Sequence, residues 1–190
     1  LTGSGTYSYG SQASLSASPE ANSSFLGWDS YDSATGNWTA ASGSGSLDES
    51  SQKSVTVYEE TYLNGYFSPN VYPTDSNLTD SLKAYLSSYT DTLYFSGVPI
   101  GNSPDQLTQA HLESISAFSS SGNKISNLEG LQYAKNLAYL YLDRHRISSI
   151  TPLIDLPYLY HLKIKENFLD LSDLTVQTEI YNLRSRFVTV

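Results

Sequence analysis

The chain has 190 residues and 39% of them are hydrophobic, which is enough to bury one large core or two small ones. Its formal net charge is −9 and no run of Lys or Arg stands out, so we expect no nucleic acid partner, because phosphate binding needs clustered basic side chains. The absence of cysteine excludes disulfides, thiolate nucleophiles and cysteine metal sites. No stretch approaches the roughly 18 consecutive apolar residues of a membrane-spanning helix, so we expect no membrane span.

Residues 1–73 are rich in Ser, Thr, Gly, Asn and Tyr, and short segments in them alternate apolar and polar residues. An alternation with period two is typical of antiparallel strands that are buried on one face. The sequence therefore predicts a small antiparallel β domain, with SGSGS at 42–46 as a loop. The alternating stretches are ASLSA at 13–17, SVTV at 54–57 and YLNGYF at 62–67.

After residue 73 the sequence becomes Leu-rich, with spacings that suit helices. In SNLTDSLKAYLSSY, residues 76–89, apolar residues recur every three or four positions, and Asp75 or Ser76 can cap the helix. The sequence predicts a short amphipathic helix here, and VYPTDS at 71–76 as the linker before it.

A second helix is predicted in SPDQLTQAHLESI, residues 103–115. Ser103 would be its cap, Pro104 would take the first helical position, where its missing N–H costs nothing, and Gln106 would complete a capping box.

A sequence repeat follows. ISNLEGLQYAKNLAYLYLDRHR starts at Ile125 and the equally long ISSITPLIDLPYLYHLKIKENF starts at Ile147, with apolar residues in matching positions. Extension backwards by one repeat places a degenerate turn at Ile115 and Phe118. A period in the twenties with the pattern LxxLxL predicts a solenoid in which each turn contributes one short strand and needs its neighbours to bury its apolar face.

The outer face of this predicted sheet follows from strand geometry. Because side chains alternate, Leu140 and Leu142 would point inward while Tyr139 and Tyr141 point outward. Parallel stacking then brings residues that are one repeat apart into columns on the outer face. These columns are Ala117, Tyr139 and His161; Ser119, Tyr141 and Lys163; and Ser121, Asp143 and Lys165.

The repeats resemble the internalin-type leucine-rich repeats of bacterial surface proteins, whose units read LxxLxxLxLxxNxIxxIxxL. Asn123 and Asn167 occupy the Asn position, which ties the turn backbone, while His145 replaces it in the middle turn and would mark a looser or differently bonded loop. The flanking segments, including LDLSDL and IYNLRSRFVTV, are similar to that family's caps. The resemblance implies a leucine-rich-repeat domain over 74–190, with a helical N-cap at 74–113, repeats at 114–170, and a C-cap at 171–190 with a helix ending near Arg184 and a last strand at 187–190.

A second resemblance lies in PEANSSFLGW, Pro19 to Trp28, which is similar to the P-x-x-G-x-x-F-x-G-W segment of the divergent internalin B repeat, also called the bacterial repeat domain. Asn22 stands where that family usually has Gly, and Asn tolerates a left-handed backbone better than most residues. VTVYEETYLNGYF resembles the closing strands of that domain. Together the two resemblances imply an α+β chain of two domains, with a β-grasp-like domain over 1–73 before a short solenoid of parallel strands.

Catalytic and metal chemistry find little support. His111 is interpreted as a surface or packing residue. A zinc site can be drawn from Asp143, His145, His161 and Glu166, but these residues lack a recognised ligand spacing. No serine has a nucleophile-elbow setting, and no acidic segment fits a calcium loop. We therefore expect a non-enzyme with no catalytic residues, no bound metal and no cofactor.

The function predicted is a non-catalytic, extracellular bacterial binding or adhesion module, secreted or attached to the cell surface, which binds a protein or a glycan while the β domain acts as a spacer. Tyrosine suits such a face because its ring is rigid and amphipathic. The alternatives are a self-associating subunit of an extracellular fibre or surface layer, and an accessory module of a larger secreted enzyme. The predicted binding residues are Tyr139, Tyr141, Asp143, His161, Lys163 and Lys165.

Overall fold

The computed structural model describes residues 11–32, 37–40, 52–56, 63–88, 93–95, 98–100, 106–122, 124–186 and 188–190. The chain forms two compact units, one comprising Leu1–Asn70 with Thr90–Asn102 and the other Val71–Tyr89 with Ser103–Val190. The sequence places residues 74–113 in a helical cap, whereas Thr90–Asn102 groups with the first unit. That residues 1–73 and 74–190 fold as independent domains stays a prediction.

The described residues of the first unit form antiparallel strand pairs. The segments predicted at 13–17, 54–57 and 62–67 correspond to β1, β4 and β5, and the SGSGS segment at 42–46 lies outside the described residues. Strand β2 is central in one sheet and pairs with both β3 and β5, while β1 pairs with β4 and β6 pairs with β7. The strands are β1 (Gln12–Ser16), β2 (Ser23–Asp32), β3 (Asn37–Ala40), β4 (Gln52–Thr56), β5 (Leu63–Pro69), β6 (Leu93–Phe95) and β7 (Val98–Ile100).

The turn before β2 has the left-handed backbone that the sequence predicts. Asn22 has φ 62°, and its carbonyl oxygen accepts a hydrogen bond of 2.8 Å from the Asn70 backbone N–H. The aromatic residues that follow pack together, since the Phe25 ring lies 5.3 Å from the rings of both Trp28 and Phe67. Trp28 is almost fully buried. This motif therefore supplies both a turn and a large part of the local core.

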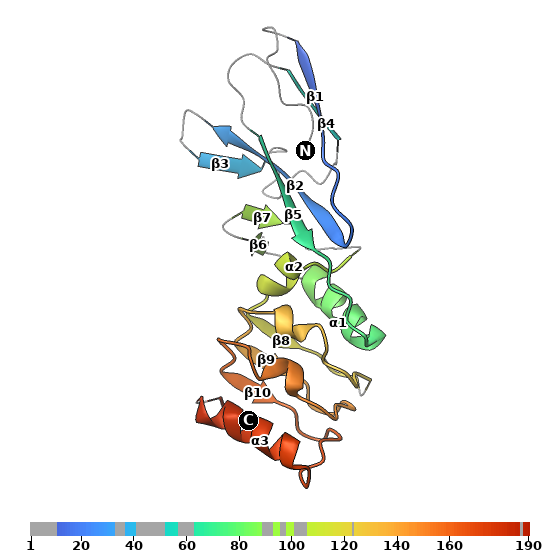
Figure 1. Cartoon of the computed structure of the whole chain (residues 1–190), viewed down its shortest axis with the longest axis vertical. Coiled ribbons are helices and arrows are strands. Elements are labelled where there is room, and N and C mark those ends of the chain that lie inside the picture. The colour runs from blue at the N-terminus through green and yellow to red at the C-terminus, as the bar shows by residue number, and fades with distance from the viewer. Residues whose placement is uncertain are drawn as a thin grey trace. The chain divides into compact units, whose positions relative to one another are not determined.

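The second unit combines helices with a parallel sheet, so the chain as a whole has an α+β fold. Figure 1 shows the ribbon passing from α1 and α2 through β8, β9 and β10 to α3. In the described part of the unit, the sheet order is β10-β9-β8 and both pairings are parallel. The elements are α1 (Ser76–Ser87), α2 (Gln109–Glu113), β8 (Ala117–Ser119), η1 (Leu131–Tyr133), β9 (Tyr139–Tyr141), η2 (Thr151–Leu153), β10 (His161–Lys163) and α3 (Leu174–Ser185).

The strands recur once per repeat and pair in register. Leu140 lies between Phe118 and Leu162 in the sheet, and all three side chains are buried. The predicted apolar positions of the two full repeats line one core, except that Leu169 is only half-buried. The buried repeat positions are Ile125, Ile147, Leu128, Ile150, Leu131, Leu153, Leu137, Leu159, Leu140, Leu162, Leu142 and Ile164.

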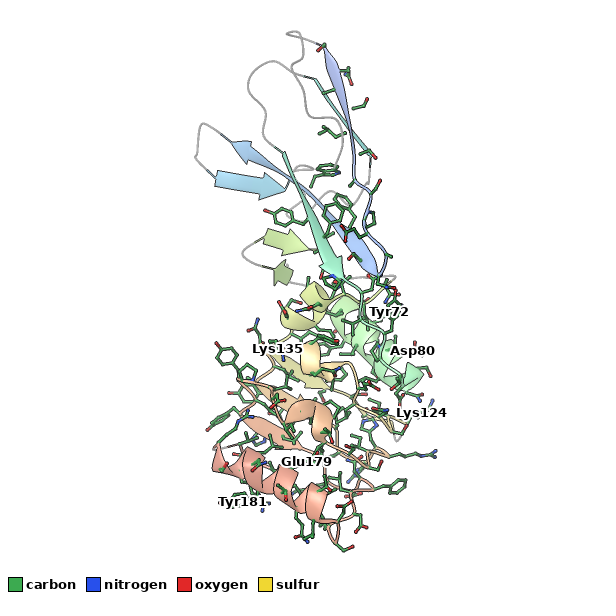
Figure 2. The ribbon with its side chains drawn as sticks, in the orientation of Figure 1. Tyr72, Asp80, Lys124, Lys135, Glu179 and Tyr181 are labelled. Carbon is green, nitrogen blue, oxygen red and sulfur yellow. The ribbon has the colours of Figure 1, made fainter. Side chains whose placement is uncertain are left out.

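The C-terminal segment closes this core. Helix α3 ends at Ser185, close to the predicted Arg184, and Thr189 then forms a parallel bridge to His161. Glu179 and Tyr181 both lie on α3 (Figure 2). Glu179 is buried, and its Oε1 accepts a hydrogen bond of 2.5 Å from the hydroxyl of Thr151 in η2. The helix is thereby tied to the last repeat turn.

Helix α2 begins later than the sequence predicts. Its N-cap is Thr108, whose hydroxyl oxygen accepts from the backbone N–H of His111 at 3.3 Å, while Nδ1 of His111 accepts from the backbone N–H of Thr108 at 3.2 Å. This reciprocal pair is a capping box in which histidine takes the place of glutamine or glutamate. His111 is thus a buried capping residue, in agreement with the packing interpretation.

The predicted cap for this helix is wrong because the preceding residues pair elsewhere. Ser103 and Pro104 lie outside the described residues, but Gln106, predicted as the third helical residue, precedes the helix. Its Nε2 donates to the backbone carbonyl oxygens of Val71 and Leu107, both at 3.1 Å. The Gln106 side chain therefore bonds to backbone outside α2 and does not occupy the third position of a helix.

The prediction of a linker at residues 71–76 is also corrected, because in the structure this segment is part of the second unit. Val71 is buried and its N–H donates to the carbonyl oxygen of Leu107 at 2.9 Å. Pro73 packs against Gly130, where an added Cβ would lie 3.0 Å from Pro73 Cγ. Gly130 also has φ 109°, a conformation that side chains disfavour, so glycine is required there on two grounds.

Asp75 joins the start of α1 to the first repeat turn. Its Oδ1 caps the helix by accepting from the backbone N–H groups of Asn77 at 2.8 Å and Leu78 at 3.2 Å. Its Oδ2 accepts from the N–H and the hydroxyl of Ser126, at 2.7 and 2.8 Å, and from the N–H of Asn127 at 3.1 Å. One carboxylate thus satisfies five donors from two segments that are far apart in the sequence.

These donors change the acidity of Asp75. Burial raises the pKa of the carboxyl, but the hydrogen bonds from Ser126, Leu78 and Asn127 favour the ionised form more strongly, and the pKa falls from its ordinary value of 3.8 to about 2. A carboxyl whose pKa is lower in the folded than in the unfolded state stabilises the fold at every pH above its pKa in the unfolded state. That contribution, on the order of 2 kcal/mol, is lost as the pH falls from about 4 to about 2.

We predict that Asp75→Asn lowers the free energy of unfolding by about 2 kcal/mol at neutral pH. The amide oxygen can still cap α1, but the amide NH₂ would face the N–H groups of Ser126 and Asn127. Urea unfolding between pH 7 and pH 2 measures the effect, and the difference from wild type should shrink below pH 4.

The matched control is Asp173→Asn. Asp173 caps α3 by accepting from the N–H of Thr175 at 2.7 Å and is exposed to solvent. Asn is an equally good cap, so this variant should change stability by only a few tenths of a kcal/mol. Equal effects of the two substitutions, or a pH-independent effect at Asp75, would contradict this account.

Candidate binding face

The outward side chains of β8, β9 and β10 stand in the predicted columns. Tyr139 lies between Ala117 and His161, and Tyr141 lies between Ser119 and Lys163. Together with Ser121, Asp143 and Lys165, one step further along the chain, these residues are called the strand face below. Tyr139 is 42% exposed, Lys163 and Lys165 are exposed, and Tyr141, Asp143 and His161 are half-buried.

The rings on the strand face contact one another. The His161 ring lies 5.6 Å from the Tyr141 ring and 6.5 Å from the Tyr139 ring, measured between centroids. The Lys163 amino group lies over the Tyr141 ring, 5.0 Å from its centroid, which is within the range of a cation–π interaction. The outward side chains of β9 and β10 therefore pack against each other, which restricts their motion.

Tyr160 extends this cluster, although strand alternation does not predict it. Its ring is 58% exposed and lies 6.1 Å from the Tyr139 ring, with an angle of 71° between the ring planes. Tyr160 precedes β10, so the outward positions within the strand do not include it. The signal that could have found it is the aromatic residue at a position where the earlier turns have Ala138 and Ser116.

The third column serves the fold as well as the surface. Asp143 Oδ1 accepts from the backbone N–H of Lys165 at 2.7 Å, so this predicted binding residue links two successive turns. Next to it, Arg144 and Glu166 form an ion pair of 3.2 Å, and both have left-handed backbones with φ of 63° and 56°. Both side chains are largely exposed, so the pair contributes little to stability.

The Asn position is bonded alike in two turns although its residue changes. Asn167 Oδ1 accepts from the N–H of Ile147 at 3.0 Å, and its Nδ2 donates to the carbonyl oxygen of Leu142 at 2.8 Å. One repeat earlier, His145 replaces the asparagine. Asn123, predicted for the same position, lies outside the described residues.

The His145 ring makes the equivalent two bonds. The N–H of Ile125 donates to Nδ1 at 3.3 Å, which places the ring proton on Nε2, and Nε2 donates to the carbonyl oxygen of Ser120 at 3.0 Å. His145 is only 4% exposed. The loop is thus bonded through an imidazole ring in place of an amide. Of the two possibilities predicted from the sequence, a looser loop or a differently bonded one, the structure has the second.

The remaining site candidates are weaker. Within the described ranges, no group of three or more His, Asp or Glu side chains is placed to hold a metal ion. Of the four residues drawn as a zinc site, His145 bonds to backbone, Asp143 accepts from Lys165 and Glu166 pairs with Arg144. None of the helices in the described part of the chain has the length and hydrophobicity of a membrane span.

A depression of about 460 Å³ is found away from the strand face, next to η1 and η2. Several of its polar groups already bond within the chain: the Ser149 and Thr151 hydroxyls lie 2.8 Å apart, and Gln132 Oε1 accepts from the N–H of Gly130 at 2.6 Å. It contains no aromatic side chain. The residues lining it are Ser126, Asn127, Glu129, Gln132, Ser148, Ser149, Thr151, Pro152 and Asp155.

Comparison with known proteins gives matches among solved structures alone. No family model and no curated protein matches the sequence. An internalin (inlF) from Listeria monocytogenes is 29% identical, with a TM-score of 0.43, over 57% of this chain and 28% of its own. An internalin C2 from the same organism is 24% identical, with a TM-score of 0.43, over 58% of this chain and 42% of its own.

A third similar structure contains the CBM51-2 and INT domains of Clostridium perfringens ZmpB. It is 21% identical, with a TM-score of 0.38, over 50% of this chain and 18% of its own. The chain thus spans less than half the length of each of these proteins.

We predict that His145→Asn leaves the free energy of unfolding within about 1 kcal/mol of wild type, because asparagine makes both bonds at position 167. His145→Leu should instead cost roughly 2–4 kcal/mol, since it leaves the buried N–H of Ile125 and carbonyl of Ser120 without this partner. Chemical denaturation measures both values. A leucine variant as stable as wild type would show that the two bonds do not hold the turn.

Proposed function

We propose that this chain is a non-catalytic, extracellular bacterial binding module, secreted or attached to the cell surface. In this proposal the second unit is a short leucine-rich-repeat solenoid that presents its strand face to a protein or glycan ligand. The first unit is a β-grasp-like spacer of the divergent internalin B type.

The observation that carries the proposal is the cluster of aromatic rings on the strand face. Tyr139 and Tyr160 expose about half of their surface, although the leucines beneath them already fill the core. The position of Tyr139 is set by a sheet whose register the core determines, and the Tyr160 ring packs against it, so a ligand would meet rings that are already in place. Preorganisation of this kind lowers the entropy that binding costs.

The surroundings of the histidines support a non-catalytic role. His111 caps a helix, His145 bonds to the backbone of two neighbouring segments, and His161 packs near two tyrosine rings. A general base needs an orienting partner and a substrate within reach. His161 is the histidine that remains available to a ligand, and its ring neighbours suit it to contact and not to proton transfer.

We predict that replacing both Tyr139 and Tyr141 by Ala abolishes ligand binding and leaves the melting temperature nearly unchanged, because both side chains lie outside the core. Binding of the labelled chain to immobilised extracellular proteins and glycans measures the effect. Tyr181→Ala is the control, since Tyr181 is an exposed tyrosine on α3 (Figure 2).

Equal binding by the double variant and wild type would overturn the proposal, as would equal losses in the double variant and in Tyr181→Ala. Light scattering of the same samples separates ligand binding from self-association. Polymers that form without any ligand would favour a fibre or surface-layer subunit in place of a binding module.

A further inference from the structure

We propose that the ligand of the strand face is a short acidic saccharide, which stacks a sugar ring against Tyr139 and Tyr160 and places its carboxylate at Lys163 and Lys165. This inference rests on the proposed function and names the class of ligand. It follows from the size of the face, the angle between two exposed rings and the local charge.

The size of the strand face favours a small ligand. Its strands have three residues each and belong to one short sheet. At about 4.8 Å between strands and 3.3 Å per residue, the sheet covers an area of only about 10 Å by 10 Å. A stable protein–protein interface buries roughly 800 Å² on each partner, several times this area. A ligand of two or three sugar residues matches the face without needing further surface.

The two exposed tyrosines form a corner. Their planes stand at 71° with the centroids 6.1 Å apart, so one ring can lie under a flat ligand while the other borders its edge. Ala117 is the neighbour of Tyr139 on β8, so no large side chain stands at the position paired with Tyr139 on that strand. The apolar C–H face of a sugar suits a tyrosine ring, while the phenol hydroxyl can bond to sugar hydroxyls.

The charge of the strand face is opposite to that of the chain. The formal net charge of the protein is −9, yet β10 carries Lys163 with Lys165 just beyond it. Among the described residues, Glu166 pairs with Arg144, and neither lysine amino group forms an ion pair with a carboxylate. Two lysines on an acidic protein form a local site for an anion.

The position of Lys163 matches a ligand in the corner. Its amino group rests on the Tyr141 ring, which limits its freedom before any ligand arrives. Lys163 follows His161, the neighbour of Tyr139, by two residues, a distance of roughly 7 Å along the strand. That distance is comparable with the length of one sugar residue, so a sugar in the corner would bring the carboxylate of the next sugar to the lysines.

The test is isothermal titration of the full chain with trigalacturonic acid, with its neutral methyl ester as the matched ligand. We expect the acid to bind at least about tenfold more tightly than the ester, and raised salt to remove most of the difference. The double variant Lys163→Gln with Lys165→Gln should reduce the affinity for the acid about tenfold and leave that for the ester unchanged. Tyr160→Ala should weaken both ligands, and Tyr181→Ala should weaken neither.

Equal affinity for the acid and the ester would overturn the charge assignment. If neither saccharide binds, but hexaglutamate or a protein from the panel binds and this binding needs Tyr139 and Tyr141, the saccharide inference is wrong while the proposed function stands. If nothing binds through these tyrosines, both are wrong. Circular dichroism of each variant confirms that a loss of binding is not a loss of folding.

Discussion

The second unit depends on the parallel pairing of strands that lie one repeat apart in the sequence. Each of these strands has only three residues, and a turn of this kind cannot bury its apolar side alone. Pairing in register places Phe118, Leu140 and Leu162 in one buried column. The same register determines which side chains meet on the outside, so core and surface are set by one constraint. A shift by one residue would exchange the two faces.

Polar side chains hold the stack together where the strands end. Asn167 and His145 each bridge two neighbouring backbone segments, and Asp143 links one turn to the next. At the start of the stack Asp75 does the same for α1 and the first turn. At its other end, buried Glu179 ties α3 to η2. Buried backbone groups must be bonded, and these side chains supply the partners where the sheet cannot.

The sequence predicts two kinds of structural feature: those that recur with the repeat and those that depend on a single residue and its neighbours in the chain. The repeat period gives the outward columns, because stacking carries one strand's geometry to the next. The left-handed turn at Asn22 and the Asp75 cap of α1 follow from the preferences of single residues. The sequence predicts Ser103 as the cap of α2, whereas in the structure the cap is Thr108. Helix α2 begins only after Gln106 has donated to the Val71 carbonyl oxygen and Leu107 has accepted from the Val71 N–H, a contact between distant segments that no local pattern reveals.

The residues of the candidate site also differ in whether the sequence predicts them. Strand alternation predicts Tyr139 and Tyr141, whereas Tyr160 precedes its strand and joins the cluster through the packing of its ring. Binding at the strand face requires the turns to stack in this register. Because the chain has no cysteine, a pair of introduced cysteines can report the register directly.

The variant with Tyr139→Cys and His161→Cys should form an intramolecular disulfide on mild oxidation, since residues paired across parallel strands lie about 5 Å apart. The variant with Tyr141→Cys and His161→Cys should not, because the diagonal distance of about 8 Å is too long. Mass spectrometry of the oxidised proteins distinguishes the two. Efficient bridging in the diagonal pair, or none in the paired positions, would contradict the stacking on which the strand face depends.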